Sequence, residues 1–210
     1  MQTNFSKREA NKIEKKAIFM RAAEKLFMEK GYENTSIEDI VKEAGITKRT
    51  LYQYFQNKED LYYAIALEGA HQLYDASMVA LEQGESTREK IHLMNLAHLE
   101  FYKQHLDLFQ ILNYTPANRN NNEASPHFQE IRRLDAERMM LLVQLISTGA
   151  SDGSINPDLE MKKAVVFGIF SAFCMLYTFA FTDKNIWQAL QMDEEDFLRF
   201  SFDLISKALT

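Results

Sequence analysis

Apolar residues recur at the three-to-four-residue spacing of helices through most of the chain. The first run predicts a helix that opens at a capping box, Ser6 with Glu9, and ends at Gly31. Later runs predict helices over residues 58–81, 86–106 and 126–149, another that follows Asn156-Pro157, and a last one over 193–209. We count about nine helices and no convincing strand, so the predicted fold class is all-α.

Residues 164–182 contain no charged side chain. A membrane-spanning helix needs about 20 apolar residues, so this stretch is nearly long enough to be one. Gly168, Ser171 and Thr178 interrupt it, and the preceding helices are amphipathic, which favours a helix buried on all sides and no contact with a membrane. A fully buried helix near the end of the chain also implies a partner surface.

Residues 35–58 carry the signals of two short helices joined by a tight turn. Two overlapping capping boxes begin at Thr35 and Ser36. Gly45 is placed to end the first helix with a positive φ, and Thr47 can cap the second. Because the second helix is cationic and aromatic, the pair is predicted to be a helix-turn-helix that lies in a DNA major groove.

Residues from about Lys12 to Leu61 resemble the DNA-binding domain of the tetracycline-repressor (TetR) family of transcriptional regulators. The resemblance rests on many residues in one register rather than on one short pattern. It implies a three-helix DNA-binding domain over residues 1–58 and a helical effector-binding and dimerisation domain over 59–210. The matching segments are 22–27, 29–32, 35–40, 44–48 and 51–61.

The charge is distributed unevenly. Residues 1–60 hold 12 Lys and Arg against 10 Asp and Glu, whereas residues 61–210 hold 12 against 20. A basic N-terminal segment followed by an acidic remainder, residues 61–210, which we call the body, fits a local nucleic-acid contact. A single cysteine, Cys174, excludes an internal disulfide and fits a reducing compartment. The first residues lack an apolar run, so we expect no secretory signal and a cytoplasmic location.

The resemblance places the base-reading positions at Lys48, Arg49 and Gln53. Arginine can bond guanine O6 and N7 together, and glutamine can bond adenine in the same way. Many family members have glycine where this chain has Arg49, so this residue makes either a base contact specific to this protein or one more phosphate contact. The remaining candidate DNA-binding residues, most of them at the family's phosphate-binding positions, are Thr35, Ser36, Thr47, Thr50, Tyr52, Tyr54 and Lys58.

Several of these residues have a second role open to them. Thr35 and Ser36 would cap a helix with or without DNA, and Tyr52 could be a core aromatic. Lys7, Arg8 and Lys12 could follow the DNA backbone or a minor groove, or they could belong to a disordered, solvated tail.

The family resemblance also implies a small-molecule effector that binds the body and releases DNA. The adaptable and aromatic side chains of the body suit a bulky apolar or aromatic ligand, although core packing explains the same residue types. The candidate ligand-binding residues are Phe101, Tyr102, His105, Phe109, Tyr114, Met139, Met140, Phe170, Cys174 and Tyr177. No cofactor is expected.

Two other functions stay open. Glu68 with His71, and Glu89 with His92, have the Glu-x-x-His spacing of di-iron carboxylate enzymes, but no glutamate lies within residues 164–182 and Glu89 also fits a capping role. The second alternative is a DNA-binding regulator without an effector. The preferred hypothesis is a repressor, not an enzyme, that binds a palindromic double-stranded operator as a homodimer. In the resembling family the last two helices, here about 158–182 and 193–209, form the dimer interface.

Overall fold

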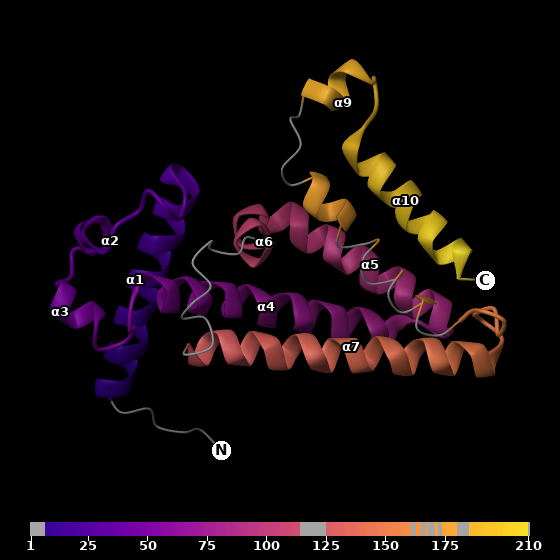
Figure 1. The fold of residues 1–210 in the computed structure, drawn as a ribbon, viewed down its shortest axis with the longest axis horizontal. Coiled ribbons are helices and arrows are strands. Elements are labelled where there is room, and N and C mark those ends of the chain that lie inside the picture. Colours follow the sequence, from indigo (N-terminus) through magenta and orange to yellow (C-terminus); the bar gives the residue numbers. More distant parts are fainter. Residues whose placement is uncertain are drawn as a thin grey trace. The chain divides into compact units, whose positions relative to one another are not determined.

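The computed structural model describes residues 7–113, 125–160, 163–164, 167, 171, 174–179 and 185–209 (Figure 1). No strand occurs among these residues, so the all-α prediction is confirmed. The helices are α1 (Lys7–Lys30), α2 (Ile37–Ala44), α3 (Lys48–Leu51), α4 (Lys58–Gln83), α5 (Thr87–Gln104), α6 (Leu106–Asn113), α7 (Pro126–Asp152), α9 (Asn185–Ala189) and α10 (Glu194–Ala208).

The chain divides into two compact units. Unit 1 comprises residues 1–68 with 114–131, and unit 2 comprises residues 69–113 with 132–210. The division falls inside α4 and inside α7, whereas the predicted functional boundary lies at residue 58. That functional boundary stays a prediction.

Local signals in the sequence explain how α2 and α3 begin and end. Ser36 caps α2, and Asp39 completes the capping box by accepting hydrogen bonds from both Ser36 N and Ser36 Oγ. Gly45 ends α2 at φ 65°, a conformation that glycine adopts without a Cβ penalty. Thr47 caps α3 by accepting from Thr50 N. The predicted helix-turn-helix is therefore present, with its turn and both caps at the expected residues.

The core of unit 1 is formed by apolar residues from the first four helices. Phe19 and Phe27 of α1, Ile40 of α2, Leu51 of α3 and Phe55 are each buried. Since α3 contributes Leu51 inward, its other side chains are left on the outside. This packing fixes the orientation of α3 within the unit.

The start of α7 belongs to unit 1. Ser125 caps the helix by accepting a hydrogen bond from Phe128 N, and Pro126 is its first residue, as predicted. Ser125 Oγ in turn donates to the buried carboxylate of Asp60, near the start of α4.

Three apolar clusters occur among the described residues of unit 2. The largest joins α4, α5, α6 and α10 through buried residues that include Leu73, Leu99, Phe109 and Phe202. The second joins α5 and α7 through Ile91 and Ile146, and the third joins α4, α5 and α7. The helix predicted over residues 86–106 is interrupted, because α5 ends at Gln104 with His105 as its cap, and α6 begins at Leu106.

The sequence predicts a helix that follows residues 156–157. Residues 163–164, 167, 171 and 174–179 of this stretch are described, and they are helical. The predicted burial of this helix on all sides, which implied a partner surface, is not complete in the single chain. Leu176 and Phe179 are buried, but Phe167, Cys174 and Tyr177 are exposed. The single chain therefore leaves several described side chains of this stretch uncovered. Among the described helices, none is long and apolar enough to cross a membrane.

The last helix, α10, begins at Glu194 after its cap Asp193, close to the predicted start at residue 193. The short helix α9 was not predicted.

Candidate DNA-binding surface

The exposed face of α3 and the turn after it form the candidate DNA-binding surface. Lys48, Arg49 and Gln53 are all exposed, and Tyr52 is 49% exposed, so Tyr52 is not a core aromatic. Backbone bonds from Gln53 N to Thr50 O and from Tyr54 N to Leu51 O continue the turn beyond α3. The three candidate base-reading side chains are therefore exposed on α3 and on the turn that directly follows it.

Thr47 and Thr50 lie at the start of this surface. Their hydroxyl oxygens are 3.0 Å apart, and the Thr47 hydroxyl also accepts from the Thr50 amide. Ser36, at the start of α2, is exposed with its hydroxyl bonded to Asp39. Hydroxyls and free amides at helix starts are suited to phosphate oxygens.

Lys48 forms an ion pair with Glu38 of α2. The hydrogen bond between them raises the pKa of Lys48 and lowers the pKa of Glu38, so both groups are charged at neutral pH. Because both side chains are exposed, this pair contributes little stability. Lys48 can therefore exchange Glu38 for an acceptor on DNA at small cost.

A surface groove of about 530 Å³ lies between α1 and the turn after α3. Lys12 and Lys15 of α1 line it together with Gln53 and Tyr54. The sequence singled out Lys12 but not Lys15, although the three-residue spacing of the two lysines on one helix was a readable signal. The groove extends the cationic surface from α3 onto α1.

Two predicted phosphate contacts face the interior of unit 1. Thr35 is 1% exposed, and its hydroxyl is near both Leu26 O and Gly31 O, at 3.1 and 2.9 Å. Lys58 Nζ donates to Tyr32 O at 2.8 Å and Thr35 O at 2.9 Å. Burial lowers the pKa of Lys58. These contacts hold the start of α4 against the turn before α2, and they leave Thr35 outside the exposed surface.

The candidate ligand-binding residues are only partly brought together. Phe101, Tyr102 and Phe109 share the largest cluster of unit 2, and the Tyr102 hydroxyl donates to Glu194 at 2.8 Å. His105 is exposed beside Phe101. The exposed remainder consists of Met139, Met140, Cys174 and Tyr177, while Tyr114 and Phe170 lie outside the described residues.

The two Glu-x-x-His pairs do not resemble a metal centre. Glu68 and His71 are exposed on α4. Glu89 accepts from Glu85 N, and His92 faces Asp203 at 3.6 Å. Over the described part of the chain, no group of three or more metal-ligating side chains is close enough to hold an ion.

Comparison with known proteins adds to this geometry. Residues 19–65 match the sequence profile of "Bacterial regulatory proteins, tetR family". An HTH-type transcriptional regulator of Bacillus subtilis, YhgD, is 27% identical over 162 residues, which cover 76% of this chain and 82% of that protein. The HTH-type transcriptional repressor KstR2 of Mycolicibacterium smegmatis is 25% identical over 148 residues, covering 70% and 71%.

The fold has solved counterparts. A bacterial regulatory protein in the tetR family from Rhodococcus RHA1 superposes with a TM-score of 0.71 at 19% identity, covering 93% of this chain and 96% of that one.

Proposed function

The chain belongs to the tetR family of bacterial regulatory proteins, and we propose that it is a ligand-responsive repressor that binds a palindromic operator as a homodimer. The observation that carries this proposal is the exposed, capped α3 surface, on which Lys48, Arg49 and Gln53 stand together. Members of the family and the matched relatives are transcriptional regulators, not enzymes.

Residues of the α3 surface contact the base edges. Arg49 is exposed and has no hydrogen bond or ion pair with the other described residues, so it is available to bond guanine at O6 and N7, while Gln53 has the amide that pairs with adenine. Ser36, Thr47, Thr50, Tyr52 and Tyr54 supply phosphate contacts that set the register on the duplex. Lys12 and Lys15 extend these contacts along the adjoining backbone.

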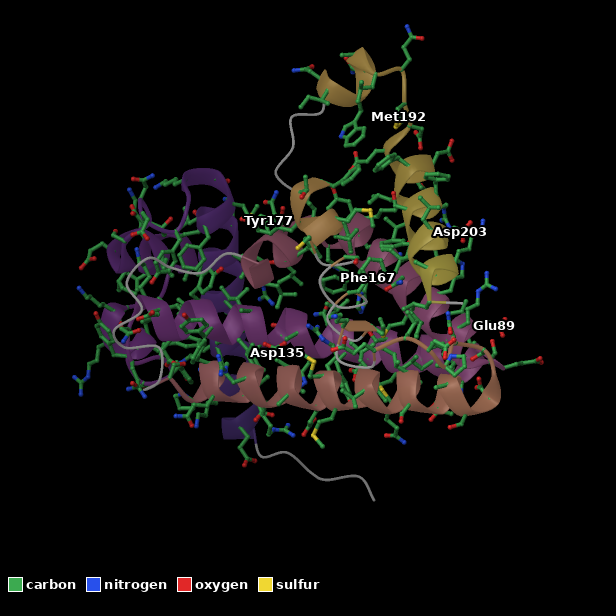
Figure 2. The ribbon with its side chains drawn as sticks, turned by 45° about the vertical axis from the view of Figure 1, so that its right-hand side comes forward. Glu89, Asp135, Phe167, Tyr177, Met192 and Asp203 are labelled. Carbon is green, nitrogen blue, oxygen red and sulfur yellow. The ribbon has the colours of Figure 1, made fainter. Side chains whose placement is uncertain are left out.

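Homodimerisation is supported by exposed apolar side chains near the C-terminal end. Phe200 and Leu204 of α10 are 58% and 50% exposed. Phe167, Tyr177 and Met192 are exposed as well (Figure 2). A second copy covering these side chains would remove apolar area from water, and a two-fold dimer would match a palindromic operator.

The repressor role has support from one of the relatives. KstR2, one relative, is a transcriptional repressor by name. An effector releases DNA only if it binds the DNA-incompetent state more tightly than the DNA-competent state. The difference between the two binding free energies limits how far the effector shifts the equilibrium between these states. A regulator that lacks an effector would bind the same operator but would show no ligand-dependent release.

Selection of duplexes from a random DNA pool tests the proposal. We expect enrichment of an inverted repeat, bound with an even number of protomers in sedimentation measurements. The proposal fails if no sequence is enriched above nonspecific DNA binding, which added salt weakens equally for all sequences.

A further inference from the structure

A surface groove of about 590 Å³ lies between α4 and α5 in unit 2. The two helices lie side by side (Figure 1), in agreement with the buried contacts between them. The volume falls within the range of small-molecule pockets, roughly 300–1,000 Å³. Neither the DNA-binding surface nor the side chains proposed for the dimer interface line this groove, so it has no role in the functions described so far.

The apolar part of the groove has room for a ligand. Three of its side chains are alanines, whose single methyl groups leave space above the helix surfaces. Val79 is 57% exposed, although its side chain is apolar. Covering such a side chain with an apolar ligand removes its surface from water, which is favourable. The apolar lining consists of Ala76, Val79 and Ala80 of α4 and Leu93, Leu96 and Ala97 of α5.

The register of α4 and α5 places two carboxylates at the same level of the groove. The two helices are antiparallel, because the short turn 84–86 joins them. Ser77 of α4 lies opposite His98 of α5, with 2.9 Å between Ser77 Oγ and His98 Nε2. Asp75 precedes Ser77 by two residues, and Glu100 follows His98 by two. Two residues correspond to about 200° of helix rotation, so Asp75 and Glu100 are level with one another on the opposite side, where both line the groove.

Both carboxylates are available to a ligand. Asp75 is exposed and has no hydrogen bond or ion pair with the other described residues. Glu100 is exposed as well, and its Oε1 accepts a hydrogen bond from Gln104 Nε2 at 2.5 Å. The other oxygen of Glu100 accepts none from the described residues. Each carboxylate therefore has at least one oxygen open to a donor.

The cations beside this pair are already bonded to another carboxylate. Arg199 of α10 also lines the groove, and its Nη2 and Nε donate to Glu195 at 2.7 and 2.9 Å. Lys103 Nζ donates to the second oxygen of Glu195 at 2.7 Å. Glu195 and, to a smaller extent, Glu100 raise the pKa of Lys103, so these groups lie close together. With Asp75, three carboxylates accompany two cations, and one negative charge is left unmatched.

An amphipathic ammonium matches this arrangement. An ammonium group donates charge-assisted hydrogen bonds to carboxylates, and these are stronger than bonds between neutral groups. From the level of Asp75 to Gln83, which also lines the groove, α4 rises about 12 Å. An alkyl chain that extends over this distance covers the apolar lining on its way. A small cation would gain little from exposed carboxylates alone. An uncharged chain would take water from the carboxylates without a bond in return.

We propose that the groove between α4 and α5 binds a primary alkylammonium effector. The ammonium bonds Asp75 and Glu100, and the chain lies on the apolar lining toward Gln83. This inference rests on the proposed function, because it names the chemistry of the effector. The groove lies in unit 2, and α4, which forms one of its walls, begins in unit 1. The effector thus contacts a helix that both units share.

Calorimetric titration at pH 7 tests the proposal with octylammonium, 1-octanol and butylammonium, each below the concentration at which it aggregates. We expect octylammonium to bind at least about tenfold more tightly than 1-octanol, which lacks the charge, and than butylammonium, which lacks half of the chain. The double variant Asp75→Asn with Glu100→Gln should bind octylammonium and 1-octanol equally. Both side chains are exposed and the substitutions preserve their size, so this variant should fold.

A second double variant provides the matched control. Glu82→Gln with Asp107→Asn removes the same two charges from exposed positions outside the groove lining, on α4 and α6, and should retain the preference for octylammonium. An equal loss of binding in both double variants would show a general attraction to an acidic protein and overturn the site. Equal binding of octylammonium and 1-octanol by wild type, no binding of either, or a preference that survives the first double variant would each overturn it too.

The duplex selected from the random pool separates this proposal from the proposed function. Release of the duplex by octylammonium from wild type, but not from the variant of Asp75 and Glu100, supports the effector site. Ammonium-selective binding that leaves the duplex bound would overturn the effector role. Ammonium-selective binding by a chain that selects no duplex would instead overturn the regulator and keep the ammonium site.

Discussion

The carboxylate of Asp60 accepts a hydrogen bond from His127 Nδ1 at 2.8 Å, although the two residues are 67 positions apart in the chain. Ser125 Oγ donates to the same oxygen at 2.8 Å, and Gln56 N donates to the other at 3.0 Å. Asp60 therefore ties the start of α7 to the start of α4 within unit 1. The side chain of Asp60 is only 5% exposed, so these bonds are shielded from water.

The stability of unit 1 should fall in acid because of Asp60. Burial raises the pKa of this carboxyl, but the bonds from Gln56, His127 and Ser125 together outweigh burial and hold the pKa below its ordinary value. The stabilisation is therefore complete above the unfolded-state pKa of about 3.9 and is lost as pH falls through the lower folded value.

We expect Asp60→Asn to lower the free energy of unfolding by about 2 kcal/mol at pH 7 and to weaken its dependence on pH below about 4. Urea denaturation at several pH values measures both effects. Asp75→Asn, an exposed aspartate on the same helix, is the matched control. Equal effects of the two substitutions would show that the buried bonds contribute nothing.

Lys58 is expected to stabilise unit 1 whether or not it also contacts phosphate. Its ammonium bonds two carbonyl oxygens and lies 4.2 Å from the centre of the Tyr32 ring. We expect Lys58→Met to lower the free energy of unfolding by about 2 kcal/mol, because two partly buried carbonyl acceptors lose a charged donor. Denaturant titration beside the exposed Lys42→Met measures this. A loss of DNA affinity with unchanged stability would mean that the carbonyl contacts are incidental.

Lys12 and Lys15 should contribute to DNA binding without specifying sequence. Each phosphate contact releases counterions, so neutralising both lysines by substitution to glutamine should reduce the slope of log affinity against log salt by about 1.8. The selected sequence should not change. Lys42→Gln serves as the control for a general effect of charge. An unchanged slope would place α1 away from the DNA backbone.

We expect Leu204 to lie in the dimer interface. Its side chain is half exposed in the single chain, and a charge there would be buried in a dimer. We expect Leu204→Asp to weaken dimerisation at least about 100-fold in analytical ultracentrifugation, roughly 3 kcal/mol, and to weaken operator binding with it. Val79→Asp, at a similarly exposed apolar position on α4, should leave the dimer intact. A Leu204→Asp variant that stays dimeric would move the interface elsewhere.

The caps of the helix-turn-helix were predictable because their signals are local. The capping contacts of Gly45 and Thr47 involve residues within about one helical turn, so the neighbouring sequence is enough to predict both caps. The roles of Thr35 and Ser36 were not separable in this way, because both begin a capping box. The structure makes Ser36 the cap because Thr35 turns inward toward Leu26 O, a contact with another helix.

Other features depend on tertiary packing and left no pattern in the sequence. The carbonyls that bind Lys58 come from residues 32 and 35, whose convergence follows from the fold. The hydrogen-bond contact between Ser77 of α4 and His98 of α5 likewise depends on how the two helices pack. The helix α9 has five residues, too few for an apolar period to show.

The most direct test of sequence reading by the α3 surface is duplex selection with wild type and Arg49→Ala in parallel. We expect the variant to enrich the same inverted repeat with one base pair relaxed in each half-site, and to bind the wild-type site about 10- to 100-fold more weakly, the 1–3 kcal/mol of a bidentate base contact. An identical preference at every position, with affinity lowered uniformly, would make Arg49 a phosphate contact and contradict base reading by this residue.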